Sequence, residues 1–446
     1  MSLTITDVKI PLRGRLVEGA ISIQNERIAK VGMTSAALEG AEKISGRGLI
    51  ALPGLIDIHV HLRDMELAYK EDFSTGTMAA AAGGFTTVLD MPNTKPPTDS
   101  AERVREKIAN AGPMIHVNVG FYGKLPASPI KQHEMKMAGA IAFKLYMNDP
   151  APDGWHRDPV KLLNSLKGTR SLRMPVACHA ESGTKIARIQ ARYQEDGKRS
   201  IRDFVRAHSP RYELEAVRLF TDLARAARSK AHISHLSTQL ALRRVIAARR
   251  AGTKVTCEAT PHHLLLSQEE FAGKRVLALM VPPLRSTRDA RSLWKSVING
   301  QIDAVASDHA PHTLEEKMSG DAWEVKPGIP GLETTLPLLL TKLHQGQMSL
   351  TRIIELLAAD PAKIFGLNRK GRIAVGADAD LVLIDPKERF RIDSTKFYSK
   401  AHFSPFDSRE CVGRPVLTMV AGHVVYDHGE IVETHKGKIL AHGAEG

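Results

Sequence analysis

The heptapeptide DIHVHLR, residues 57–63, determines how the rest of this 446-residue chain is interpreted. It follows an apolar lead-in and has the composition of a strand end, where successive side chains point to opposite faces. Asp57, His59, His61 and Arg63 therefore share one face. Two imidazoles at this spacing can bind one metal ion, and a guanidinium one step further can bind a carboxylate through paired hydrogen bonds. A hydrogen-bonded polar pair is the alternative for the two histidines taken alone.

Four more residues suited to metal binding or acid–base chemistry each follow a short apolar run, and these are Lys144, His179, His235 and Asp308. A hydrogen-bonded core residue would explain any one of them, but not four runs that end in the same way. In a (β/α)8 barrel the carboxyl ends of the strands converge on one face, which holds the active site. The pattern therefore predicts an α/β fold, a TIM-type (β/α)8 barrel, with a metal site at its mouth.

Eight apolar runs have the length of barrel strands, at residues 55–61, 85–89, 114–119, 141–145, 175–179, 231–235, 254–257 and 304–307. Helix-like segments lie between most of them, for example at residues 101–111, 212–227 and 238–251. Alternating strands and helices predict parallel βαβ units, and eight such units close a barrel. The long charged gap after residue 179 predicts a loop and a helix near the site, and residues 148–154 have the composition of a further loop.

Short alternating apolar and polar runs occupy both ends of the chain, at residues 4–50 and 371–446. Neither end is long enough for a comfortable core of its own. We therefore expect the two ends to pack together as one small β-sandwich beside the barrel. The predicted division gives residues 1–52 and 367–446 to the β-sandwich and residues 53–366 to the barrel.

The composition is that of a globular enzyme. No stretch approaches the roughly 20 apolar residues of a membrane span, and the N-terminus lacks the apolar core of a signal peptide. The three cysteines are few and odd in number, which indicates a reducing compartment, so we expect a cytoplasmic protein. Cys178 adjoins His179, but strand alternation directs it to the opposite face, and we interpret it as a small buried apolar residue.

The formal net charge of +13 raises the question of a nucleic-acid partner. The basic residues are spread along the chain, and the densest group, within residues 225–250, flanks a predicted barrel strand. No zinc-finger, aromatic RNA-binding platform or helix-turn-helix motif is present. We interpret the basic residues as the solvated side of outer helices and expect no nucleic-acid or membrane partner. A positive field can still assist an anionic substrate.

Over nearly its whole length the chain resembles the dihydroorotases, cyclic amidohydrolases of pyrimidine (UMP) biosynthesis. The motifs that carry the resemblance are DIHVHLRD at 57–64, AAGGFTTV at 81–88, MPNT at 91–94, FKLYM at 143–147, CHAE at 178–181, ISHL at 233–236, TPHHL at 260–264, ASDHAPHT at 306–313 and PGLET at 330–334. Residues 308–317 and 398–406 are especially similar to the dihydroorotase domain of the animal multifunctional pyrimidine-synthesis protein.

The resemblance implies an enzyme that reversibly closes N-carbamoyl-L-aspartate to L-dihydroorotate with two Zn²⁺ ions per chain. It implies that His59, His61 and Asp308 hold one ion and that His179 and His235 hold the other. Asp308 would also be the catalytic residue that moves a proton between the hydroxide bridging the metals and the ring nitrogen.

In the same resemblance Lys144 bridges both ions together with the hydroxide. An unmodified lysine is a poor ligand because its free pKa is about 10.4. Carboxylation of Lys144 by carbon dioxide would turn the amine into an anionic oxygen donor and remove this objection.

The resemblance also assigns contacts with the small anionic substrate. Arg63 would pair with its carboxylate, and Asn93 and His312 would bind the same end. Taken alone, Asn93 is better interpreted as a turn residue between Pro92 and Thr94, and His312 is equally a partner that orients other side chains. Three further residues would orient the metal ligands, and these are Glu258, His262 and His263.

One position departs from the family pattern. Val281 stands before PPLR at 282–285, where many bacterial members have asparagine and the animal domain has arginine. Valine cannot hydrogen-bond a pyrimidine ring, so either Arg285 or backbone groups compensate, or the substrate differs.

Two other functions therefore stay open. A hydantoinase (dihydropyrimidinase) or allantoinase would use the same metals on a neutral ring, and these relatives generally lack an arginine at the position of Arg63. A non-catalytic structural homologue would typically have lost metal ligands, whereas all six positions are filled here. A homodimer and an association with aspartate transcarbamoylase are both compatible with the resemblance.

Overall fold

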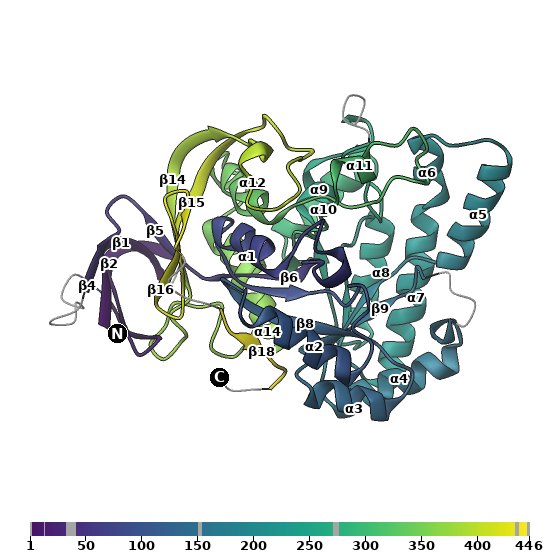
Figure 1. Ribbon diagram of the computed structural model, residues 1–446, viewed down its shortest axis with the longest axis horizontal. Helices are drawn as coiled ribbons and strands as arrows, with labels where there is room; N and C mark the ends of the chain where they lie inside the picture. Colours follow the sequence, from purple (N-terminus) through teal and green to yellow (C-terminus); the bar gives the residue numbers. More distant parts are fainter. Residues whose placement is uncertain are drawn as a thin grey trace.

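The computed structural model describes residues 2–12, 14–32, 42–149, 154–270, 276–432 and 437–443. Of the loop predicted at 148–154, residues 150–153 lie outside the described part. The described strands form two sheets, a barrel wrapped by helices and a smaller sheet built from both ends of the chain (Figure 1).

Eight parallel strands form a nearly closed barrel, as predicted. In chain order they are β6 (Leu55–Val60), β7 (Phe85–Asp90), β8 (Asn118–Lys124), β9 (Ala142–Tyr146), β10 (Val176–His179), β11 (Ala231–Ile233), β12 (Val255–Ala259) and β13 (Ala304–Val305). Each strand pairs with its neighbour in sequence, so the sheet order follows the chain. The carboxyl ends of the strands therefore point to one common face.

The barrel closes between its first and last strands through a side chain as well as the backbone. The His61 amide donates to the His309 carbonyl at 2.7 Å, and a parallel bridge joins Val60 to His309. The buried Asp57 carboxylate accepts from the Ser307 amide and from the His59 amide, each at 3.0 Å. Asp57 thus links the two strand ends that carry His59 and Asp308.

Helices connect the strands and cover the barrel. They are α1 (Phe73–Ala82), α2 (Ala101–Ala111), α3 (Pro129–Met137), α4 (Pro159–Ser171), α5 (Gly183–Glu195), α6 (Ile201–Ala207), α7 (Pro210–Ala227), α8 (Gln239–Arg250), α9 (Pro261–Leu265), α10 (Thr287–Ile298), α11 (Leu314–Lys317), α12 (Leu332–His344), α13 (Leu350–Ile354), a π-helical turn (Glu355–Ala359) and α14 (Asp360–Phe365). The start of α2 is capped by Ser100 and that of α8 by Thr238, whose side chains accept backbone amides of the first turn. The predicted helix positions at α2, α7 and α8 are confirmed to within two residues.

The third barrel strand was predicted too early, at 114–119, whereas β8 spans Asn118–Lys124. Asn118, Gly120 and Gly123 interrupt the apolar pattern there and resemble turn residues. The structure shows why glycine is needed within this strand: a Cβ on Gly123 would lie 2.4 Å from the Met135 side chain, and one on Gly120 2.8 Å from Leu89. Close packing of neighbouring elements therefore outweighs the low strand preference of glycine.

The two chain ends form one small β-domain, as expected. A single sheet runs in the hydrogen-bonded order β17 (Glu430–Ile431), β16 (His423–Asp427), β15 (Glu410–Val420), β14 (Leu381–Arg391), β5 (Ile50–Pro53), β1 (Ser2–Leu12), β2 (Arg15–Gln24) and β3 (Arg27–Gly32), with β4 (Glu42–Ser45) paired to β1. Antiparallel pairing of β5 with β14 joins the two ends. The strands enclose their own apolar core, which includes Leu3, Ile21, Leu381 and Met419.

The last described segment leaves this domain. β18 (Ile439–Leu440) pairs in parallel with Val119 and Gly120 of β8 in the barrel, although residues 367–446 were all assigned to the β-sandwich.

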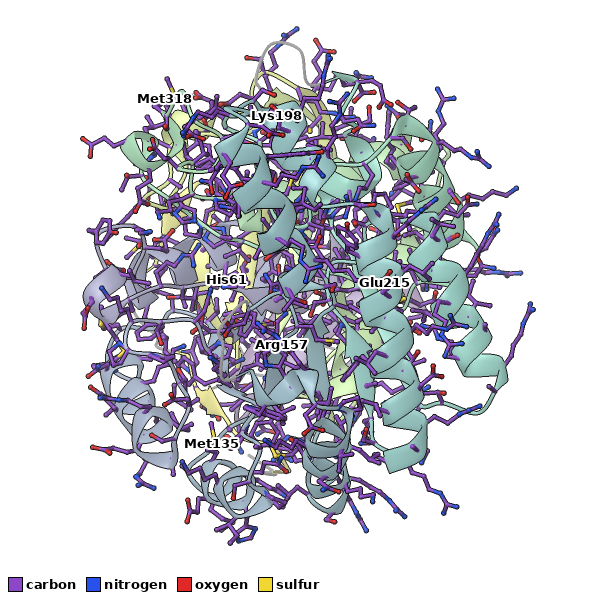
Figure 2. All side chains as sticks on the ribbon, turned by 90° about the vertical axis from the view of Figure 1, so that its right-hand side faces the viewer. His61, Met135, Arg157, Lys198, Glu215 and Met318 are labelled. Carbon is purple, nitrogen blue, oxygen red and sulfur yellow. The ribbon has the colours of Figure 1, made fainter. Side chains whose placement is uncertain are left out.

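Outer helices such as α7 and α8 carry long basic side chains on their solvent side, as the nitrogen-tipped side chains in Figure 2 show. Within the described residues, no helix is both long and apolar enough to cross a membrane.

Candidate active site

One cavity of about 260 Å³ opens at the carboxyl ends of the barrel strands. It brings together all nine residues predicted to bind metal or substrate, which are His59, His61, Arg63, Asn93, Lys144, His179, His235, Asp308 and His312. They come from six of the eight strand ends, so only the closed barrel can assemble them.

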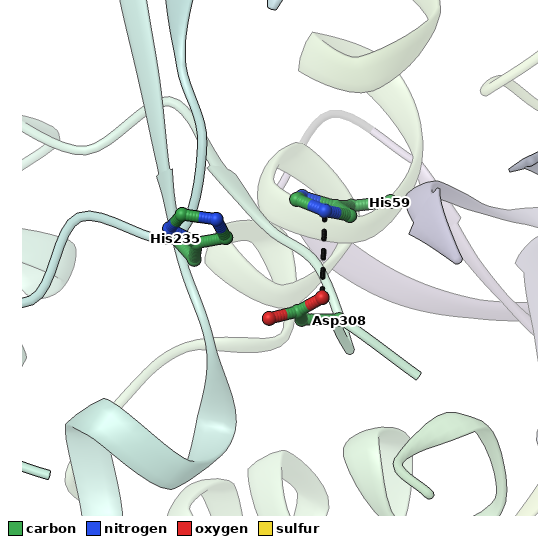
Figure 3. Close-up of side chains that lie close together, drawn as sticks. All are labelled: His59, His235 and Asp308. Atoms are coloured by element: carbon green, nitrogen blue, oxygen red, sulfur yellow. Dashed lines mark ion pairs between the residues drawn. The ribbon is translucent and has the colours of Figure 1, made fainter. Parts of the chain in front are cut away.

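Three of these side chains form a compact group of potential metal ligands. One ligand atom each of His59, His235 and Asp308 lies within 4.8 Å of the others (Figure 3). His59 Nε2 is 3.4 Å from Asp308 Oδ1, and His61 Nε2 is 3.2 Å from the same oxygen. Imidazole nitrogens and a carboxylate oxygen are the donors that zinc prefers.

His179, another predicted metal ligand, lies against this group. The rings of His179 and His235 are 4.4 Å apart between centroids, and His179 Nε2 is hydrogen-bonded to Glu181 Oε2 at 2.9 Å. The resemblance assigned His235 to a different ion from His59 and Asp308, whereas the compact group combines two residues of one assignment with one of the other. The geometry is thus one continuous cluster of ligand atoms rather than two separated sets.

The protonation states of the cluster suit metal binding. Burial lowers the pKa of His61 to about 4 and holds that of His235 well below its usual range. Burial opposes ionisation of Asp308, but the neighbouring His59 and His61 hold its pKa well below its usual range. Neutral imidazoles and an ionised carboxylate are the forms that bind a metal ion. His235 Nδ1 is also buried with no hydrogen-bond partner among the described residues.

Lys144 lies fully buried at the base of the cavity. Its Nζ donates to Ser234 Oγ at 2.7 Å and lies 3.4 Å from His59 Nε2. Burial lowers the pKa of Lys144 to about 8. A substantial fraction of this lysine is therefore a neutral amine near neutral pH, which is the nucleophilic form.

The buried Glu258 on β12 orients two elements of the cluster. It contacts His59 Nδ1 and accepts from the His235 backbone amide at 3.1 Å and from His232 Nε2 at 3.0 Å. Burial opposes its ionisation, but the two imidazoles hold the pKa of Glu258 below its usual range. A carboxylate behind a ligating histidine fixes the ring and raises its basicity. His262 also lines the cavity, whereas His263 is bonded to the Pro282 carbonyl at 3.0 Å.

Three site residues have left-handed backbone conformations that are uncommon for side-chain-bearing residues. The φ angles are 57° at Arg63, 34° at His235 and 48° at Asp308. Each residue lies just beyond a strand, where the turn directs its side chain into the cavity. Such strain is typical of functional sites, where the surrounding structure imposes it.

Arg63 and His312 form a hydrogen-bonded pair on the cavity wall. Arg63 Nη2 donates to His312 Nε2 at 3.1 Å, and Nε donates to the Pro311 carbonyl at 3.2 Å. His312 Nδ1 in turn donates to Glu316 Oε2 at 3.0 Å, and Lys70 Nζ lies 2.7 Å from the other oxygen of Glu316. On the neighbouring strand end, Asn93 Oδ1 accepts from His61 Nδ1 at 2.6 Å, which leaves its amide nitrogen as a donor.

Apolar side chains also line the cavity, at the position where the sequence departs from the family pattern. Val281 lies there with Met280 and Ile329. Arg285 is not among the lining residues: its Nε donates to Ser237 Oγ at 2.9 Å, and its Nη2 lies 3.6 Å from Glu181 Oε1. Arg285 is therefore not placed to make the hydrogen bond to the substrate ring that Val281 cannot make. Backbone groups remain as the alternative donors or acceptors.

Tyr146 and Ser234 lie in or beside the cavity, although neither was predicted from the sequence as a site residue. Tyr146 follows Lys144 by two residues on β9, and strand alternation would have placed it on the same face. Ser234 precedes His235 and accepts from Lys144, a contact for which the sequence gives no signal because it joins two strands. Cys178 lies in the core behind the cavity, as predicted.

Comparison with known proteins adds independent evidence. A family model described as "Amidohydrolase family" matches residues 50–425. A dihydroorotase of Methanothermobacter thermautotrophicus is 40% identical over 417 residues, which cover 93% of this chain and 92% of that protein. A dihydroorotase of Bacillus cytotoxicus is 38% identical over 430 residues, which cover 93% and 95%.

Solved structures with the same fold have related names. L-hydantoinase (dihydropyrimidinase) from Arthrobacter aurescens superposes with a TM-score of 0.91 at 30% identity, covering 96% of this chain and 97% of its own. D-hydantoinase (dihydropyrimidinase) from Thermus sp. has a TM-score of 0.90 at 28% identity and covers 99% of both chains.

Proposed function

We propose that this chain, which belongs to the amidohydrolase family, interconverts N-carbamoyl-L-aspartate and L-dihydroorotate as a dihydroorotase. Its family and its relatives indicate a hydrolase that acts on a cyclic amide. The hypothesis of a non-catalytic structural homologue is therefore rejected. The two dihydroorotases named above are 38–40% identical to this chain over more than nine-tenths of its length. This similarity supports dihydroorotase activity among the reactions of cyclic amide hydrolases.

The observation that carries the proposal is the position of Arg63. Its guanidinium is buried and lines the same cavity as the metal-ligand cluster. A buried cation needs an anionic partner, and L-dihydroorotate has a ring carboxylate, whereas hydantoin, dihydrouracil and allantoin do not. His312 accepts from Arg63 and so orients it, and Asn93, which lines the same cavity, keeps an amide donor for the same group.

The amidohydrolase family is metal-dependent, and His59, His235 and Asp308 form a candidate metal site. The residues present fit such a group, since the ligand atoms converge, burial holds the pKa of His235 well below its usual range, and His235 Nδ1 has no other described partner. We assign two zinc ions to the cluster, held by His59, His61, His179, His235, Asp308 and a modified Lys144.

Lys144 is suited to carboxylation. Its neutral amine attacks carbon dioxide, a nitrogen–carbon bond forms, and one proton leaves, which yields an anionic carbamate. The lowered pKa of about 8 makes the amine available, and the Ser234 hydroxyl next to Nζ can donate to a carbamate oxygen. Carboxylation would thus supply the anionic oxygens that a bridging ligand needs.

In the hydrolytic direction water adds to the ring carbonyl carbon, the carbon–nitrogen bond breaks, and the ring nitrogen takes up a proton. Bound metal ions would polarise the carbonyl and lower the pKa of the attacking water. Asp308, ionised and exposed to the cavity, would accept the proton of the water at a carboxylate oxygen and pass it to the ring nitrogen. Arg63 holds the carboxylate, which fixes the ring for this transfer.

A hydantoinase is the second candidate, because specific observations favour it. Val281 presents an apolar wall, and the superposed solved structures are hydantoinases. A neutral ring would suit these apolar side chains but would offer no carboxylate to the Arg63 guanidinium. The dihydroorotase function therefore explains more of the cavity.

Purified enzyme should be assayed side by side with L-dihydroorotate, dihydrouracil, hydantoin and allantoin. We expect the highest kcat/KM with L-dihydroorotate. A higher kcat/KM with dihydrouracil, hydantoin or allantoin would contradict the proposal and favour the hydantoinase hypothesis.

A further inference from the structure

Tyr146 lines the active-site cavity, and nothing above has given it a role. We propose that its phenolic hydroxyl donates a hydrogen bond to the carboxylate of the cyclic substrate, beside Arg63, and so contributes to substrate specificity. This inference rests on the proposed dihydroorotase function, because only a substrate with a carboxylate requires the extra donor.

The position of Tyr146 follows from its strand. It ends β9, two residues beyond Lys144, so both side chains lie on the inner face at the mouth of the barrel. Lys144 Nζ lies 5.6 Å from the centre of the Tyr146 ring. The tyrosine therefore lies next to the ligand cluster on the side where substrate enters.

The hydroxyl of Tyr146 is buried, yet it has no hydrogen-bond partner among the described residues. Tyr122, another buried tyrosine of the barrel, shows the usual arrangement, since its hydroxyl donates to the Ile58 carbonyl at 3.0 Å. An unpaired buried hydroxyl costs free energy, and buried polar groups are almost always paired. A substrate in the cavity would supply the missing acceptor for Tyr146.

The neighbouring donors indicate which substrate group that acceptor is. Arg63 and Tyr146 each follow a predicted metal ligand by two residues, and both line the cavity together with Asn93. Arg63 already donates Nε to Pro311 and one Nη2 hydrogen to His312. A carboxylate accepts several hydrogen bonds, so Arg63 alone leaves it incompletely bound. Several donors that line one cavity together with a guanidinium suit an anion.

The test compares the Tyr146→Phe variant with wild type and with Tyr193→Phe on the outer helix α5 as the matched control. The readouts are kcat and KM for L-dihydroorotate, the inhibition constant of orotate, metal content and Tm. Loss of a hydrogen bond to a charged group should raise KM and the orotate constant by about tenfold, with kcat within about twofold. Metal content and Tm should be unchanged, because the lost hydroxyl has no described protein partner.

Three results would overturn the inference. KM and the orotate constant could stay within about twofold of wild type, which would show that the hydroxyl does not touch the carboxylate. The loss could fall on kcat alone, which would place the hydroxyl at the reacting carbonyl. A clear drop in Tm would show that the hydroxyl stabilises the protein itself. Failure of the dihydroorotase proposal is distinct, because wild type would then not turn over L-dihydroorotate.

Discussion

Arg63 Nη2 and His312 Nε2 are hydrogen-bonded at 3.1 Å, with the arginine as donor. Burial, and then the charge of Arg63, lower the pKa of His312 to about 3, so the imidazole is neutral and can accept. The second ring nitrogen of His312 donates to Glu316, which fixes the tautomer. On the proposed function, the substrate carboxylate would meet the oriented Arg63 guanidinium beside a neutral imidazole rather than two cations that repel each other.

The His312→Asn variant should weaken substrate binding more than turnover. It removes the acceptor that orients Arg63. We expect KM for L-dihydroorotate to rise by about tenfold while kcat falls by less. Steady-state kinetics would measure both, with His133→Asn on the exposed face of α3 as the control. An unchanged KM with a large loss of kcat would assign His312 to the chemical step instead.

The Lys144→Ala variant should lose metal and most activity. A carboxylated Lys144 would contribute oxygens to both ions, so its removal should lower metal content below the expected two per chain. Short carboxylic acids should restore part of the activity by supplying those oxygens. Elemental analysis and native mass spectrometry of wild type would check the modification. An active enzyme with one metal and unmodified Lys144 would contradict the bridged site, and Lys161→Ala on α4 serves as the control.

The Asp308→Asn variant should lose turnover far more than affinity. The amide cannot accept and return a proton, and general acid–base catalysis contributes roughly 10²–10⁴-fold. We expect kcat to fall within that range, with metal content measured alongside to separate proton transfer from metal loss. A kcat within about twofold of wild type would exclude Asp308 from the proton-transfer step.

Buried histidines should make the metal-free protein less stable in mild acid. Burial lowers the pKa of His262 to about 4, whereas an unfolded histidine titrates near 6.5. Below 6.5 the unfolded chain therefore binds a proton that the native state does not, so stability falls as pH falls from 6.5 towards 4. Between pH 7 and pH 5 this one group should cost about 2 kcal/mol of unfolding free energy.

Denaturant unfolding of wild type and His262→Gln at both pH values isolates this contribution, because the other titrating groups are shared. The variant should lose less stability than wild type as the pH is lowered. Identical losses would mean that His262 has an ordinary pKa in the folded protein. His133→Gln, which alters an exposed histidine, should behave like wild type.

The sequence predicted the barrel because ligand-type residues mark strand ends, and the nine site residues do meet in one cavity. Other features depend on contacts that no local pattern encodes. The β8 strand was misplaced because Gly120 and Gly123 are required by Leu89 and Met135, which are distant in sequence. The left-handed backbone at His235 and Asp308 likewise has no local signal in the sequence, because histidine and aspartate adopt it at only a few positions.

The role of Arg63 is the central claim, and the ratio of kcat/KM for L-dihydroorotate to that for dihydrouracil tests it most directly. The two rings differ in the carboxylate that Arg63 is proposed to bind. In Arg63→Met the value for L-dihydroorotate should fall by at least about tenfold, while any activity on dihydrouracil changes by less than about twofold. An equal fall for both substrates would show that Arg63 maintains the fold rather than selecting the substrate, and would contradict the account.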